Sequence, residues 1–139
     1  HSDLRSKKIN EIKKNKKVLL VFYDDRKKIQ LRIRGNAKIE VSKKDSWDKL
    51  SNWSRRCYLS DENPGTNMQK PTSGFSEKYQ FNAPSTEESE KGLQNFTVID
   101  VIAEEVEWLF LASQGHRRML FNIKRDLGNI KIAGKWLVP

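Results

Sequence analysis

Few of the residues that often mark a reactive or metal-bound site occur in this chain of 139 residues. Cys57 is the single cysteine, so one chain can form neither an internal disulfide nor a multi-cysteine metal site. The two histidines form no recognisable triad with a nucleophile and a carboxylate. We therefore expect no metal site, a reducing compartment, and a buried or half-buried structural role for Cys57.

A long apolar run is also missing. No stretch approaches the roughly 20 apolar residues that span a bilayer, and no charged-then-apolar leader is seen. Hydrophobic residues make up 36% and charged residues 32% of the chain, which is typical of a globular protein on the polar side. The sequence therefore predicts one cytoplasmic domain with a single core and no membrane partner.

What the chain has in excess is positive charge, with a formal net charge of +9 at pH 7. Lysine and arginine concentrate before residue 45, whereas glutamates make residues 87–107 locally acidic. Nucleic-acid binding would explain the charge, but no helix-turn-helix pattern, zinc spacing or aromatic RNA-binding strand motif accompanies it. A charged ligand on one side of the domain explains the asymmetry about as well.

The first residues predict a helix start with cations in an unusual place. Ser6 is a suitable N-cap, so Lys7 and Lys8 fall in the first turn, where the helix dipole disfavours lysine. A bound phosphate would remove this conflict. Free backbone amides, two hydroxyls and up to three cations would hold it, from Ser2, Arg5, Ser6, Lys7 and Lys8. A solvated basic helix start is the alternative.

Hydrophobic periodicity predicts the first secondary-structure elements, beginning with a short amphipathic helix over residues 6–15. The compact apolar run 18–23 predicts a strand buried on both faces. Residues 29–41 alternate strictly between apolar and polar, which predicts a second strand. Residues 24–27 supply the turn of an antiparallel hairpin, and Gly35 predicts a bulge or bend.

Further along, aromatic and apolar residues at helical spacing predict a helix over residues 43–59, with Ser42 as a candidate cap. Residues 60–84 are rich in turn-forming residues and predict a mobile loop. A short helix begins near Thr86, with acidic residues in its favourable first turn. Three strands follow at residues 96–112, 116–125 and 129–138.

At least five strands, mostly in hairpin order, predict a mainly β fold. The expected form is a small closed or partly open antiparallel barrel with a few short flanking helices. The first predicted strand begins only at residue 18. A barrel of this type can need earlier strands, which this sequence does not contain.

Short motifs with a characteristic order and spacing run along the whole chain. They are Ser2-Asp3-x-Arg5-Ser6-x-Lys8, Lys17-Val18-x-Leu20-x-Phe22-Tyr23, Gln30-Leu31-Arg32-x-x-Gly35-x-Ala37, Arg55-Arg56-Cys57-Tyr58-Leu59, Glu107-Trp108-Leu109, Gly115-His116-Arg117-Arg118 and Trp136-Leu137-Val138-Pro139. Together they resemble the FMN-binding split-barrel proteins related to pyridoxamine 5′-phosphate oxidase. The resemblance implies an antiparallel, Greek-key-like split β-barrel with FMN as cofactor. It also implies that residues 1–139 form one such domain that is incomplete at its N-terminus.

The resemblance also implies a set of cofactor residues. In the family, the segment matching Ser6-Lys7-Lys8 grips the FMN phosphate, and the residues matching His1 and Ser2 line the same site. The glutamine matching Gln30 hydrogen-bonds the isoalloxazine ring, since an amide both donates and accepts. The alternative for Gln30 is a place on the solvent face of an amphipathic strand, with no ligand. The arginine matching Arg118 reaches the cofactor, usually from the neighbouring subunit, and Gln69 aligns with a glutamine that touches the flavin.

Two departures separate the chain from the oxidase itself. There an Arg-x-His pair helps to bind pyridoxal phosphate, whereas this segment reads Gln114-Gly115-His116-Arg117-Arg118. Leu109 stands where the oxidase has a tryptophan beside the flavin. Oxidation of pyridoxamine phosphate is therefore not carried over to this chain.

The leading functional hypothesis is an FMN-dependent oxidoreductase, with the flavin at a homodimer interface and a small-molecule substrate of unknown identity. The flavin would supply the chemistry, so no side-chain nucleophile is required. His116 is either a proton donor or a structural or anion-binding residue. One alternative is a non-catalytic FMN-binding module, a carrier or sensor. Another is a nucleic-acid-binding barrel that uses Arg32, Arg34 and Lys38.

Overall fold

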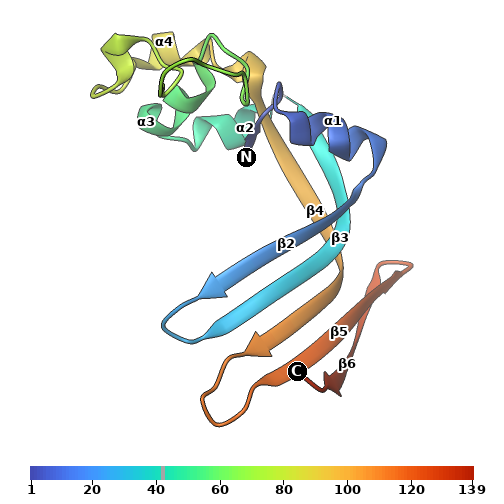
Figure 1. Cartoon of the computed structure of the whole chain (residues 1–139). Helices are drawn as coiled ribbons and strands as arrows, with labels where there is room; N and C mark the ends of the chain where they lie inside the picture. The colour runs from blue at the N-terminus through green and yellow to red at the C-terminus, as the bar shows by residue number, and fades with distance from the viewer. Residues whose placement is uncertain (42) are drawn as a thin grey trace. The chain divides into compact units, whose positions relative to one another are not determined.

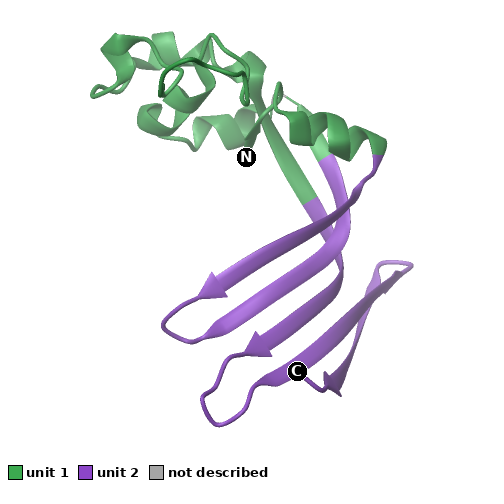
Figure 2. Cartoon of the chain, in the orientation of Figure 1, with its two compact units in different colours: residues 1–14, 39–100 green, residues 15–38, 101–139 purple. Residues whose placement is uncertain are grey.

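The computed structural model describes residues 1–41 and 43–139, and these divide into two compact units (Figures 1 and 2). Unit 1 consists of residues 1–14 and 39–100, and unit 2 of residues 15–38 and 101–139. Helices are short: α1 (Lys7–Lys14), α2 (Lys44–Asp48), α3 (Asn52–Arg55) and α4 (Thr86–Glu90), with single 3₁₀ turns η1 (Arg56–Tyr58), η2 (Glu77–Tyr79) and η3 (Leu93–Asn95).

One six-stranded sheet is formed by the described residues. Its strands are β1 (Ser2–Asp3), β2 (Lys17–Asp24), β3 (Ile29–Val41), β4 (Phe96–Phe110), β5 (Arg117–Asp126) and β6 (Asn129–Leu137). The strand order is β2-β3-β4-β5-β6, and β1 pairs with β4. Figure 2 shows that β3 and β4 each continue from one unit into the other. The structure has at least one helix within each predicted helical range, and one strand overlapping each range predicted after residue 95.

Three aromatic rings make the core of unit 1. Trp47 and Phe96 are fully buried and Tyr58 is nearly so. Their ring centroids lie 5.2–5.6 Å apart with edge-to-face geometry, the arrangement that the ring quadrupoles favour. Three partly buried side chains pack around this cluster, from Leu50, Leu93 and Val98.

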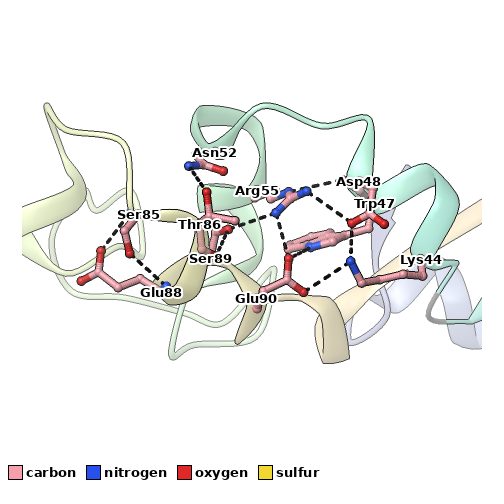
Figure 3. A network of polar contacts seen from close by, with 10 residues as sticks. All are labelled: Lys44, Trp47, Asp48, Asn52, Arg55, Ser85, Thr86, Glu88, Ser89 and Glu90. Atoms are coloured by element: carbon pink, nitrogen blue, oxygen red, sulfur yellow. Dashed lines mark hydrogen bonds and ion pairs between the residues drawn. The ribbon is translucent and has the colours of Figure 1, made fainter.

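A buried arginine joins this core to α4 (Figure 3). The Arg55 guanidinium lies over the Trp47 ring, 5.1 Å from its centroid, and donates to the Trp47 carbonyl at 3.2 Å. It also donates to Glu90 Oε1 at 2.9 Å, which accepts from Trp47 Nε1 at 3.1 Å. Because a buried cation needs such partners, this network fixes the end of α4 against the aromatic cluster.

The predicted helix over residues 43–59 is wrong as a single element, because it breaks into α2, α3 and η1. The break has a local cause. Ser51 caps α3 by accepting a hydrogen bond from the Ser54 amide at 3.2 Å, which ends the preceding helix. Cys57 is exposed, so its expected burial is also wrong. The proposed cap Ser42 lies outside the described residues.

The predicted hairpin is confirmed, with continuous antiparallel pairing of β2 and β3 from Lys17↔Asn36 to Asp24↔Ile29. Asp24 stabilises the turn by accepting from the Lys27 amide at 2.9 Å. The second hairpin, β5 to β6, pairs from Arg118↔Leu137 to Asp126↔Asn129. Its two turn residues have positive φ, as a tight hairpin turn requires.

The expectation that residues 18–23 are buried on both faces is wrong. Val21, Phe22 and Tyr23 are each about half exposed, at 55%, 54% and 51%. β2 stands at the end of the strand order and has one neighbour, so its apolar run is left uncovered. Of the described hydrophobic residues in unit 2, Ala37 alone is buried.

A bulge or bend was predicted at Gly35, and the bulge is wrong. The register passes through it without interruption, with Val18 opposite. A Cβ at this position would press on the backbone carbonyl of Ile102, 2.8 Å from its carbon, and lie 3.0 Å from the Ala103 Cα. Glycine is therefore required here because the β4 backbone approaches closely.

Residues 60–84 form an irregular segment apart from η2, as their composition predicts. Arg56 ties its second half down by donating to the carbonyls of Tyr79 and Gln80 at 2.6 and 3.0 Å. The mobility of the segment stays a prediction. Within the described residues, no helix is both long and apolar enough to cross a membrane.

Candidate functional site

The start of α1 is fixed by β4. Ser2 and Asp3 pair with Thr97 and Phe96, and the Leu4 amide donates to the Asn95 carbonyl at 2.7 Å. This two-residue strand is too short to show a period in the sequence, and it was not predicted. It holds the chain just before the helix, so the residues of the predicted phosphate site have a defined backbone.

Two buried hydroxyls meet at this helix start. Ser2 and Ser6 are 7% and 6% exposed, and their Oγ atoms lie 3.3 Å apart. α1 has no acidic residue in its first turn, while Lys7 and Lys8 are exposed there. Lys7 reaches Glu11 at 3.8 Å, a solvated pair that constrains it little. The helix start therefore fits a phosphate, with backbone amides, hydroxyls and two accessible cations.

Arg5, the third candidate cation, already has an anionic partner. Its Nε and Nη2 donate to the two carboxylate oxygens of Asp3 at 3.1 and 2.9 Å, and its backbone amide donates at 2.8 Å. The hydrogen bond to Asp3 raises the pKa of Arg5, with burial opposing it. This pair shapes the turn that leads into α1.

The other two predicted residues of unit 1 lie in different surroundings. The His1 ring packs on Phe96, with 5.2 Å between the ring centroids. Gln69 is exposed in the irregular segment.

In unit 2, Gln30 is half-buried on β3 opposite Tyr23, and its side chain makes no hydrogen bond within the part of the chain that the structure describes. A half-buried amide without a partner fits a ligand that can both accept and donate.

Arg118, the remaining predicted residue, is held by a carboxylate that sequence reasoning missed. Arg118 Nη2 donates to Glu107 Oε2 at 2.7 Å, and Arg32 Nη1 donates to Glu107 Oε1 at 3.2 Å. The hydrogen bond from Arg118 lowers the pKa of Glu107, with a smaller contribution from Arg32. In the sequence Glu107 was one member of an acidic run, and nothing local distinguishes it from its neighbours.

The polar face of β3 carries paired charges. Arg34 Nη1 lies 3.4 Å from Glu105 Oε2, and Asn36 Nδ2 donates to Glu104 Oε1 at 2.5 Å. With Arg32 on Glu107, carboxylates of β4 neutralise both arginines that the nucleic-acid hypothesis relies on. This pairing weighs against that hypothesis, because phosphate binding needs cations that are free to replace counterions.

A polar cavity of about 510 Å³ opens in unit 1 beside Tyr58, Asp61 and Lys91. Of the residues predicted to hold the cofactor, Arg5 lines this cavity and the others do not. In the described part of the chain, no group of three or more histidine, cysteine or acidic side chains is placed to hold a metal ion.

Comparison with known proteins agrees with the resemblance seen in the sequence. Residues 1–41 match the family model of the pyridoxamine 5′-phosphate oxidase FMN-binding domain. This range contains both the α1 start and Gln30. No curated protein sequence is similar enough to this chain to count as a relative.

Two solved structures are similar over almost the whole chain. One is a pyridoxamine 5′-phosphate oxidase-related, FMN-binding protein from Nostoc punctiforme, with 19% identity and a TM-score of 0.73 over 99% of this chain and 71% of that one. The other is PhzG from Burkholderia lata in complex with tetrahydrophenazine-1-carboxylic acid, with 16% identity and a TM-score of 0.66 over 99% of this chain and 66% of that one. The predicted fold class, a mainly antiparallel split β-barrel with a few short helices, is confirmed by these likenesses.

Proposed function

Taking the match of residues 1–41 to an FMN-binding domain as the premise, we propose that this chain binds FMN and acts as an FMN-dependent oxidoreductase. The observation that carries the proposal is the α1 start, where the buried Ser2–Ser6 hydroxyl pair and two exposed lysines lie within the matched residues. When bound, FMN supplies the hydride or electron transfer, and the protein supplies binding and orientation.

The phosphate of FMN would sit at the α1 start. The Ser2 and Ser6 hydroxyls, now bonded to each other at 3.3 Å, would donate to phosphate oxygens instead. Lys8 and Lys7 would supply charge, and backbone amides of the first turn the remaining donors. His1 and Gln69, which both belong to unit 1, are also proposed as cofactor residues.

Gln30 would bind the polar edge of the flavin ring, and Arg118 would reach the cofactor from a second subunit. Exposed apolar side chains at both ends of the strand order support a homodimer: Trp136 and Ile132 on β6 are 66% and 64% exposed, and Phe22 on β2 is 54% exposed. A stable monomer rarely leaves such a surface bare. Sedimentation should show a dimer, and a monomer that binds FMN would contradict the shared site.

Lys8→Ala tests the phosphate site. Losing one charge-assisted contact should weaken FMN binding by about 1.5–3 kcal/mol, roughly ten- to a hundredfold. Riboflavin, which has no phosphate, should bind both proteins equally. Lys14→Ala is the matched control, because Lys14 is an exposed lysine at the other end of the same helix. Unchanged FMN affinity in Lys8→Ala would show that the phosphate lies elsewhere.

Catalysis is tested separately from binding. The flavin bound to the protein should be reduced by NADH or NADPH and reoxidised by an organic acceptor over repeated cycles. A protein that binds FMN but turns over with no member of a broad panel would be a carrier or sensor instead.

We also propose a cytoplasmic location, where the exposed Cys57 thiol stays reduced.

A further inference from the structure

A buried carboxylate of unit 2 lies between two arginines from the neighbouring strands. Glu107 on β4 is 4% exposed. One of its oxygens accepts from Arg118 on β5 at 2.7 Å and the other from Arg32 on β3 at 3.2 Å. A carboxylate this far from water is costly unless it is paired, and here each oxygen has a cationic partner.

Only part of the Arg118 side chain is used by this contact. Its Nη2 donates to Glu107, and its Nε is buried without a hydrogen-bond partner in the described residues. The side chain is nevertheless 32% exposed, so a part of it remains accessible. Arg118 is thus fixed at one side and open to a ligand at another.

We propose that Glu107 is a positioning residue that holds Arg118 in its binding orientation before FMN arrives. The inference rests on the proposed function, in which Arg118 contacts the cofactor. An arginine side chain has many rotamers, and fixing it in advance lowers the ordering cost of binding. Outer partners of a ligand-binding side chain commonly act in this way.

The charge of the cluster fits the same role. Two arginines on one carboxylate leave a net charge of +1, so the cluster still attracts an anionic cofactor. Glu107 also screens Arg32 and Arg118 from each other, which allows two cations to approach one point on the sheet. A neutral residue at position 107 would leave both guanidinium groups without a fixed partner.

Glu105 provides a matched control. It lies two residues away on the same strand and pairs with Arg34 at 3.4 Å. Both side chains are substantially exposed, at 36% for Glu105 and 49% for Arg34. The pair has the same chemistry without the burial, so losing it should change little.

The experiment measures FMN affinity by quenching of flavin fluorescence for the wild type, Glu107→Gln, Arg118→Ala and the double variant. Glu107→Gln should weaken FMN binding about tenfold. Since Glu107 acts through Arg118, the double variant should bind no more weakly than Arg118→Ala alone. Glu105→Gln should bind like the wild type. A purely structural Glu107 would instead give losses that add in the double variant.

Three results would overturn the inference: unchanged binding by Glu107→Gln, additive losses, or tighter binding, which would mean that Glu107 competes with FMN for Arg118. If Glu107→Gln does not fold, Glu107→Asp keeps the charge but shortens the side chain, and normal FMN affinity in that variant would count against positioning. A wild-type protein that binds no FMN would remove the proposed function and this inference together. Wild-type binding with normal binding by the position-107 variants removes the inference alone.

Discussion

Replacing Gly35 with alanine tests the close approach of β3 and β4. The added Cβ would press on the Ile102 carbonyl, 2.8 Å from its carbon, and lie 3.0 Å from the Ala103 Cα. Both neighbours are backbone, so no side chain can rotate away. The strands would have to separate by several tenths of an ångström, which would stretch the Arg34–Glu105 pair.

Overpacking of this kind costs about 1–3 kcal/mol. At about 4 °C per kcal/mol for a chain of this size, Tm should fall by roughly 4–12 °C. Circular dichroism melts would measure the fall. Gly128→Ala measures backbone strain alone, because its Cβ meets nothing within 4 Å but its φ of +85° disfavours alanine, so Tm should fall there too, without any steric overlap. Gly35→Ala melting at the wild-type temperature would refute the close approach.

Three further predictions address unit 1. Trp47→Ala removes a fully buried ring and should lower the free energy of unfolding by about 3–5 kcal/mol, measured in urea. The hydrogen bond from Lys78 lowers the pKa of Glu88 to about 2. The stability that this carboxylate contributes should therefore be present above about pH 4.5 and be lost as the pH falls through about 2. Glu88→Gln should show a smaller fall in Tm over the same acidic range. Hydrogen exchange should be faster across residues 60–76 than in β4, and equal protection would contradict a mobile loop.

Sequence reasoning performed best where periodicity and turn chemistry are local. The strict alternation of residues 29–41 predicted β3 with its observed bounds, and the strand predicted over residues 129–138 is β6, which ends one residue earlier. It did less well where long-range contacts decide the outcome. Gly35 predicted a bulge or bend, because the sequence cannot show that the Ile102 backbone lies against it. Likewise, the apolar run of β2 predicted burial on both faces, but the sequence cannot show that β2 stands at the end of the strand order, where its side chains are about half exposed.

The candidate site divides in the same way. The helix start at Ser6 and Lys8 could be predicted because it has a recognisable sequence, and the contact of these two residues with a phosphate stays a prediction. The pairing of Arg5 with Asp3 depends on a turn geometry that the sequence does not reveal. Glu107 could not be predicted at all, since its burial and its two arginines come from three different strands.

Both proposals depend on the binding of FMN, which the absorption spectrum of the purified protein tests. After incubation with FMN and removal of the free flavin, the protein should retain the bands of oxidised flavin near ~450 nm, because the cofactor carries its own chromophore. The expected stoichiometry is one FMN per chain. A colourless protein under these conditions would show that this chain does not hold FMN.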